Sequence, residues 1–127
     1  MKKKELIIEK DKAGKYWGRV HHEDNLIVEN GKTVEQIESN MKKLLKKFHG
    51  LQPDEITFEH SYDLTALFEK LNFLKISTIA EYAQMNPTLL RQYVSGVKHP
   101  SKTQALKIEN AIKTLGRQMI KLEVYAA

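Results

Sequence analysis

The chain has no cysteine among its 127 residues, and only three of them are proline. Without cysteine there are no disulfides, no thiolate metal sites and no cysteine nucleophile. No apolar run approaches the roughly eighteen residues that a membrane span needs, and no apolar stretch of signal-peptide type follows the lysine-rich start. We therefore expect a cytoplasmic protein with no membrane partner.

Acidic residues are scarce in the second half of the chain. Residues 1–60 hold 12 Lys and Arg against 11 Asp and Glu, whereas residues 61–127 hold 9 against 5. Between residues 91 and 121 the only acidic residue is Glu109. The basic residues there are Arg91, Lys98, Lys102, Lys107, Lys113, Arg117 and Lys121. Such an excess suits binding to phosphate backbones, although a solvated surface gives the same composition.

The composition, with 41% apolar and 29% charged residues, is that of a soluble globular protein. A chain of this length can bury one ordinary hydrophobic core or two small ones. Residues 1–61 read as strands around one helix. The strands are expected at residues 5–10, 16–21, 26–28 and 56–59, where β-branched and apolar residues cluster between turn residues. Together with one helix, these strands predict a domain with a small open sheet, whose elements follow one another along the chain in the order β-β-β-α-β.

The helix between the third and fourth strands has clear end signals. Thr33 and Gln36 form a capping-box pair, and Gly50 follows the last helical turn. The expected apolar stripe is Val34, Ile37, Met41, Leu44 and Phe48. That stripe is enough to cover one face of the sheet.

Residues 62–127 read as an all-α domain, so the predicted fold class is α+β. Asp63 is placed to cap a first helix, and Ser77 or Thr78 to open a second. Asn86 and Pro87 are a favourable cap and first residue for a third helix that ends at Gly96. Ser101 and Gln104 form a capping box for a fourth helix, with Gly116 as its expected end.

The expected third helix has two different faces. Leu90, Val94 and Val97 point inward at helical spacing. The opposite face carries the hydrogen-bonding side chains Thr88, Arg91, Gln92 and Ser95. A short turn after Ala83, with a small residue at Ala80, is the arrangement of a helix-turn-helix whose second helix enters a major groove.

At these residues the chain resembles the helix-turn-helix of phage-repressor and Xre-type regulators. The resemblance rests on Ala80, the turn after Ala83, Leu90, and Gly96 with Pro100-Ser101, and it spans about residues 64–115. The family usually has glycine where Gln84 stands, so we expect Gln84 in a left-handed conformation.

The resemblance implies a double-stranded DNA partner, and side-chain chemistry assigns the contacts. The base-reading residues are expected to be Thr88, Arg91 and Gln92. The phosphate contacts are expected to be Ser77, Thr78, Ser95, Lys98 and Lys102. A helical bundle that only binds protein remains the alternative.

The whole chain resembles HicB-type antitoxins, through GKYWGRV at residues 14–20 and GKTVEQIESNMKKLL at residues 31–45. The resemblance implies a truncated ribonuclease-H-like domain that neutralises a HicA-like messenger-RNA ribonuclease, followed by a domain that represses the chain's own operon. We expect Tyr16, Trp17 and Arg19 to contact the toxin. The alternatives are an inhibitor module whose helical domain only dimerises, and a stand-alone regulator with an N-terminal sensing or interaction domain.

Catalysis is not expected, nor any metal or cofactor. Ribonuclease-H-type chemistry needs several converging carboxylates, and no helix carboxylate clearly joins the candidates. Those candidates are Glu9, Asp11, Asp24 and Glu59. His21 and His22 point to opposite faces of a strand, and we expect the five histidines to lie on the surface.

The end of the chain alternates as a strand does, over residues 119–125. A lone strand needs a partner, so we expect two copies to pair antiparallel about Leu122, with Lys121 of each opposite Glu123 of the other. The predicted dimerisation residues are Ile120, Lys121, Leu122, Glu123 and Val124. Such a homodimer, or a higher even-numbered assembly, presents two recognition helices about 34 Å apart.

Overall fold

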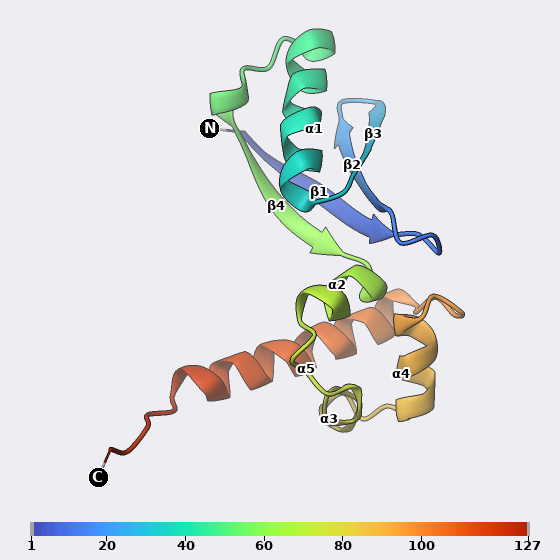
Figure 1. Ribbon diagram of the computed structural model, residues 1–127, viewed down its shortest axis with the longest axis vertical. Coiled ribbons are helices and arrows are strands. Elements are labelled where there is room, and N and C mark those ends of the chain that lie inside the picture. Colours follow the sequence, from blue (N-terminus) through green and yellow to red (C-terminus); the bar gives the residue numbers. More distant parts are fainter. Residues whose placement is uncertain (1, 127) are drawn as a thin grey trace. The chain divides into compact units, whose positions relative to one another are not determined.

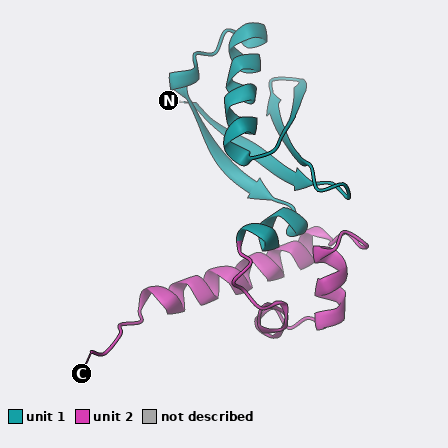
Figure 2. Cartoon of the chain, viewed as in Figure 1, with its two compact units in different colours: residues 1–70 teal, residues 71–127 magenta. Residues whose placement is uncertain are grey.

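A computed structural model describes residues 2–126, which form two compact units divided between residues 70 and 71 (Figure 2). The elements are β1 (Lys2–Lys10), β2 (Tyr16–His22), β3 (Asn25–Gly31), α1 (Val34–His49), the short 3-10 helix η1 (Pro53–Glu55), β4 (Ile56–Tyr62), α2 (Leu64–Lys70), α3 (Ile76–Tyr82), α4 (Pro87–Val94) and α5 (Lys102–Ile120). The sequence placed the domain boundary at residues 61/62, whereas α2 belongs to the first compact unit.

The first unit, hereafter the sheet unit, is built on a mixed open sheet of order β3-β2-β1-β4. β2 pairs antiparallel with both β1 and β3, and β4 pairs parallel with β1. The parallel pair follows from α1, which lies against the sheet and returns the chain to its starting edge (Figure 1). The mixed α+β class and the order β-β-β-α-β are confirmed within residues 2–62.

α1 begins and ends where its sequence signals lie. Thr33 Oγ1 accepts a hydrogen bond from the Gln36 N–H at 3.1 Å, and Gln36 Oε1 accepts one from the Lys32 N–H at 2.8 Å. Gly50 adopts the left-handed φ of 68° that closes the helix. Both end predictions are therefore confirmed.

The α1 stripe differs from the prediction. Ile37, Met41 and Leu45 are fully buried, whereas Leu44 is half-buried and Phe48 is 65% exposed. Leu45 follows Met41 by four residues, so it shares the covered face, and sequence spacing alone does not separate it from Leu44. The sheet-unit core consists of Leu6, Ile8, Val20, Ile37, Met41, Leu45, Leu51, Ile56 and Ala66.

Gly18 lets α1 approach the sheet closely. A Cβ at this position would overlap the side chain of Ile37 and come within 3.1 Å of Leu6. The α1-facing side of β2 therefore carries Gly18 and, two residues further along, the buried Val20.

The second unit, hereafter the helical unit, is organised around α3, which contacts both α4 and α5. Its buried residues are Ile79, Ala80, Ala83, Leu90, Tyr93, Ile108 and Ala111. Leu90 is buried as predicted, but the second buried position on α4 is Tyr93. Val97 is 72% exposed because Gly96, with a φ of 81°, turns the chain away from the helix.

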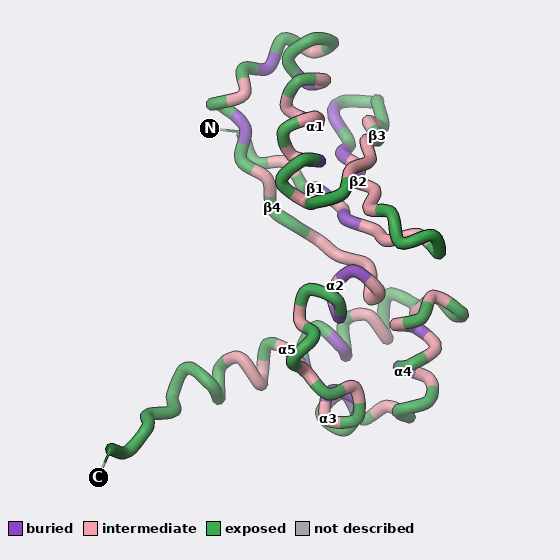
Figure 3. The backbone as a smooth tube through the Cα atoms, viewed as in Figure 1, coloured by how far each residue is buried: buried purple, intermediate pink, exposed green. Residues whose placement is uncertain are grey.

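The predicted C-terminal strand is wrong for its first residues. α5 passes through Gly116 without ending and continues to Ile120, and residues 122–126 have no regular structure in the single chain. A helix satisfies its own backbone, whereas a strand needs a second strand beside it. The end of α5 and the tail are exposed throughout residues 117–126 (Figure 3).

One histidine is buried, contrary to the expectation that all five lie on the surface. His22 is only 7% exposed; its Nδ1 accepts a hydrogen bond from the Lys4 ammonium at 2.7 Å, and its ring centroid lies 4.8 Å from that of His49. Burial, followed by the nearby charge of Lys4, lowers the pKa of His22 below its ordinary 6.5, against the opposing influence of Glu23.

The lowered pKa predicts acid sensitivity of the sheet unit. The unfolded chain binds the His22 proton more readily, so this stabilisation is complete above pH 6.5 and is lost as pH falls through the folded-state pKa. Urea unfolding followed by the fluorescence of Trp17, the single tryptophan, should show a lower midpoint at about pH 5 than at about pH 7.5. His22→Gln should reduce this dependence and the control His21→Gln should not; an equal pH dependence in all three proteins would contradict the assignment.

Candidate functional site

The turn between α3 and α4 has the geometry that its sequence indicates. Gln84 adopts a φ of 55°, the left-handed conformation expected there. The Met85 N–H then donates to the Ala80 carbonyl at 2.8 Å, and Asn86 Oδ1 accepts from the Thr88 N–H at 2.8 Å. Pro87 occupies the first helical turn. These bonds fix where α4 starts and in which direction it leaves α3.

α4 has one buried and one exposed face. Leu90 and Tyr93 are buried, while Thr88, Arg91 and Ser95 are exposed and Gln92 is half-buried. The Ser95 hydroxyl donates to the Gln92 carbonyl at 3.2 Å, so it serves partly to close the helix end. The structure therefore brings the predicted base-reading residues Thr88, Arg91 and Gln92 together on a single polar face.

The predicted phosphate-binding residues come from three elements of the helical unit. Ser77 and Thr78 lie in the first turn of α3, exposed and half-buried respectively. Lys98 is exposed in the loop after α4, and Lys102 is the exposed first residue of α5. Ser101 caps α5 by accepting from the Gln104 N–H at 3.2 Å, which confirms its predicted role.

The charge of the helical unit is strongly positive. Residues 71–127 contain eight Lys and Arg against three Glu, a net +5, and no acidic residue lies between Glu81 and Glu109. Within residues 2–126, no ion pair involves Arg91, Lys98 or Lys102. Unpaired cations beside a polar helix face attract polyanions and retain their donors for a ligand.

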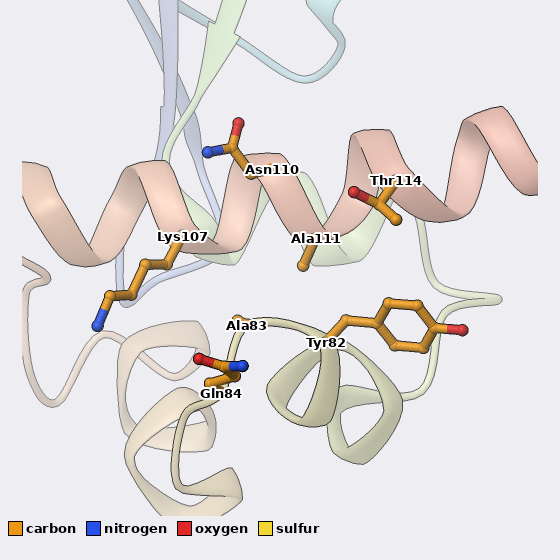
Figure 4. Close-up of a pocket in the computed structure, with 7 residues that line it drawn as sticks. All are labelled: Tyr82, Ala83, Gln84, Lys107, Asn110, Ala111 and Thr114. Carbon is orange, nitrogen blue, oxygen red and sulfur yellow. The ribbon is translucent and has the colours of Figure 1, made fainter.

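A shallow groove lies beside the same turn, between the end of α3 and α5 (Figure 4). It is lined by Tyr82, Ala83, Gln84, Lys107, Asn110, Ala111 and Thr114. Sequence reasoning missed it, although Lys107, Asn110 and Thr114 recur at spacings of three and four and so share one side of α5. Its polar side chains can form hydrogen bonds with a ligand, and Gln84 of the turn forms part of its wall.

The residues predicted to contact a toxin do not form one surface. Tyr16 lies on the α1-facing side of β2, where it packs against the core and its hydroxyl donates to Glu69 at 2.8 Å. Burial and this carboxylate raise the pKa of Tyr16 to about 12. Trp17 and Arg19 lie on the opposite side of the sheet. Only these two can meet the same partner across that side.

Local contacts hold Trp17 and Arg19 in place. The Trp17 indole donates to Asp11 at 2.8 Å, and this bond is the main cause of the lowered pKa of Asp11. Arg19 Nε lies 2.7 Å from a Glu9 carboxylate oxygen. Two of the carboxylates considered for catalysis therefore bind neighbouring side chains instead.

Within residues 2–126, no group of three or more His, Asp or Glu side chains is arranged to hold a metal ion. No helix in this part of the chain is long and apolar enough to cross a membrane. Comparison with models of protein families, with curated proteins and with solved structures yields no match to this chain.

The left-handed turn residue gives a stability prediction. Gln84→Gly should stabilise the helical unit by up to about 1 kcal/mol, because glycine adopts positive φ without the clash of a Cβ. Slower hydrogen exchange of the α3 and α4 amides than in the wild-type chain would show this stabilisation. Gln84→Ala keeps the Cβ and should give no such gain; equal protection in both variants would contradict a strained turn.

Proposed function

We propose that the chain is a sequence-specific DNA-binding repressor that also acts as the antitoxin of a HicA-like ribonuclease. The observation that carries the first half is the outward polar face of α4, flanked by unpaired cations and free of nearby acidic residues in sequence. α3, the turn at Gln84 and α4 then act as a helix-turn-helix, with α4 in the major groove.

The proposed DNA contacts fall into two sets, one to base edges and one to phosphates. Arg91 can donate two hydrogen bonds to guanine, and Gln92 can pair with adenine, with Thr88 at the same edge. Ser95, Lys98 and Lys102 contact phosphates, together with Ser77 and Thr78 in the first turn of α3. The first set supplies sequence preference and the second set supplies register and salt-dependent affinity.

The antitoxin half of the proposal concerns the sheet unit. Its thirteen Lys and Arg are balanced by thirteen Asp and Glu, so it lacks the net positive charge that favours phosphate binding in the helical unit. A neutral unit with aromatic and arginine side chains on an uncovered sheet face suits protein recognition. The DNA bound is then the operator upstream of the chain's own reading frame.

Exposed apolar side chains at the end of the chain support the proposal of a homodimer. Met119, Ile120, Leu122, Val124 and Tyr125 are 52–96% exposed, an unusual concentration of apolar side chains in solvent. A second copy would cover them, with Lys121 of one chain near Glu123 of the other in an antiparallel pairing about Leu122. Ile120 enters this contact from the last residue of α5 rather than from a strand.

Substitutions on α4 and its loop test DNA recognition. Arg91→Ala should cost about 1 to 3 kcal/mol on the preferred upstream site and reduce its preference over random DNA. Lys98→Ala should weaken both DNAs alike and lower the salt slope by about 1. Binding measured by fluorescence anisotropy at several salt concentrations gives both quantities, with Arg117→Ala as the matched control. Equal losses on both DNAs for Arg91→Ala would contradict base reading.

Charged substitutions in the tail test the dimer. Leu122→Glu combined with Val124→Glu places four carboxylates in the proposed contact, so the dimer should dissociate to monomer in sedimentation equilibrium. Lys113→Glu, on the exposed side of α5, serves as the control and should leave the mass unchanged. A double variant that keeps the wild-type mass would show that the tail does not hold the copies together.

A further inference from the structure

Two strands of the sheet unit are apolar on both faces. Residues 6–8 read Leu-Ile-Ile and residues 26–28 read Leu-Ile-Val, and consecutive strand residues point to opposite sides. Strands with apolar side chains on both faces are typical of sheets that are covered on both sides. In the sheet unit, α1 covers only the side that carries Leu6, Ile8 and Ile27.

The other side carries a contiguous set of interface-type residues, hereafter the open sheet face. Pairing places Ile7, Arg19 and Val28 in one row across three strands, with Trp17 and Leu26 in the adjoining rows. Leu26 is 52% exposed and Val28 is 47% exposed, while Ile7 and Trp17 are half-buried. The same rows also hold Glu9, Asn30 and His21. Tryptophan and arginine beside exposed aliphatic side chains are residue types that are enriched at protein interfaces.

The charges around the open sheet face indicate which class of molecule would bind there. Arg19 is paired with Glu9 at 2.7 Å and Lys3 with Glu59 at 3.7 Å. Glu5 binds the Ser61 hydroxyl and has no cation among the described ion pairs. Beside Trp17, Asp11 accepts the indole hydrogen bond and the Lys15 ammonium lies 5.5 Å from the ring centroid, so four carboxylates face three cations. The surplus carboxylate opposes the binding of a nucleic acid. A basic protein is the complementary partner.

We infer that the open sheet face is the docking surface for a small basic protein, which is the ribonuclease toxin if the proposed function holds. The inference rests on that function for the identity of the partner and on the sheet for the location. An enzyme that binds RNA needs a positively charged surface, which the carboxylates here complement. Tyr16, on the α1 side, lies outside the contact.

Paired substitutions on the two sides of the sheet unit test the location. The full-length chain is co-expressed with the product of the reading frame beside it, which the proposed function requires to be a small basic protein, and the affinity of the complex is measured by calorimetry. Val28→Glu and Arg19→Ala should each weaken binding at least about tenfold. Phe48→Glu, which replaces a 65% exposed apolar side chain on α1, should leave affinity within about twofold.

A label at Trp17 gives a second readout from the same side of the sheet. Trp17 is the only tryptophan, so 5-fluorotryptophan gives a single ¹⁹F resonance, which should shift when the basic protein binds. Tight binding of Val28→Glu and Arg19→Ala together with an unmoved resonance would overturn the docking surface alone. A wild-type chain that forms no complex would overturn the antitoxin function and the inference with it. A change in the mass of the isolated chain on Val28→Glu would assign the face to a second copy instead.

Discussion

The packing of α4 on α3 is the contact on which the functional account depends. α4 has eight residues, too few to be stable as an isolated helix, so its position comes from burial of Leu90 and Tyr93. Each such side chain contributes roughly 1.5 to 3 kcal/mol by its removal from water. That contribution offsets the cost of about 1 kcal/mol at the left-handed Gln84. Ala80 on α3 is fully buried, and its small side chain permits a neighbouring helix to approach α3 closely.

The division of charge gives the two compact units different chemistry. The sheet unit is neutral overall and the helical unit carries all of the +5 net charge. Long-range attraction of a polyanion therefore acts on the helical unit, whereas the sheet unit offers apolar side chains beside paired charges. The proposed function therefore assigns DNA and a basic protein to separate surfaces of one chain.

Local signals made most of the elements predictable. Caps at Thr33, Asn86 and Ser101 fixed helix starts, since each supplies an oxygen to an otherwise unpaired N–H. Positions decided by tertiary contact were not predictable: Leu45 and Tyr93 are buried in place of Leu44 and Val97. The candidate DNA face followed from helical spacing, but the α3–α5 groove and the separation of Tyr16 from Trp17 by the sheet required the fold.

The central claim, that the polar face of α4 enters DNA, is tested most directly by amide chemical-shift mapping. The ¹⁵N-labelled chain is titrated with duplex DNA from upstream of its own reading frame, with a scrambled duplex for comparison. The account predicts that the largest shifts fall on residues 88–95 and the following loop to Lys102, and that they are larger with the upstream sequence. Shifts confined to the sheet unit, or identical with both duplexes, would contradict it.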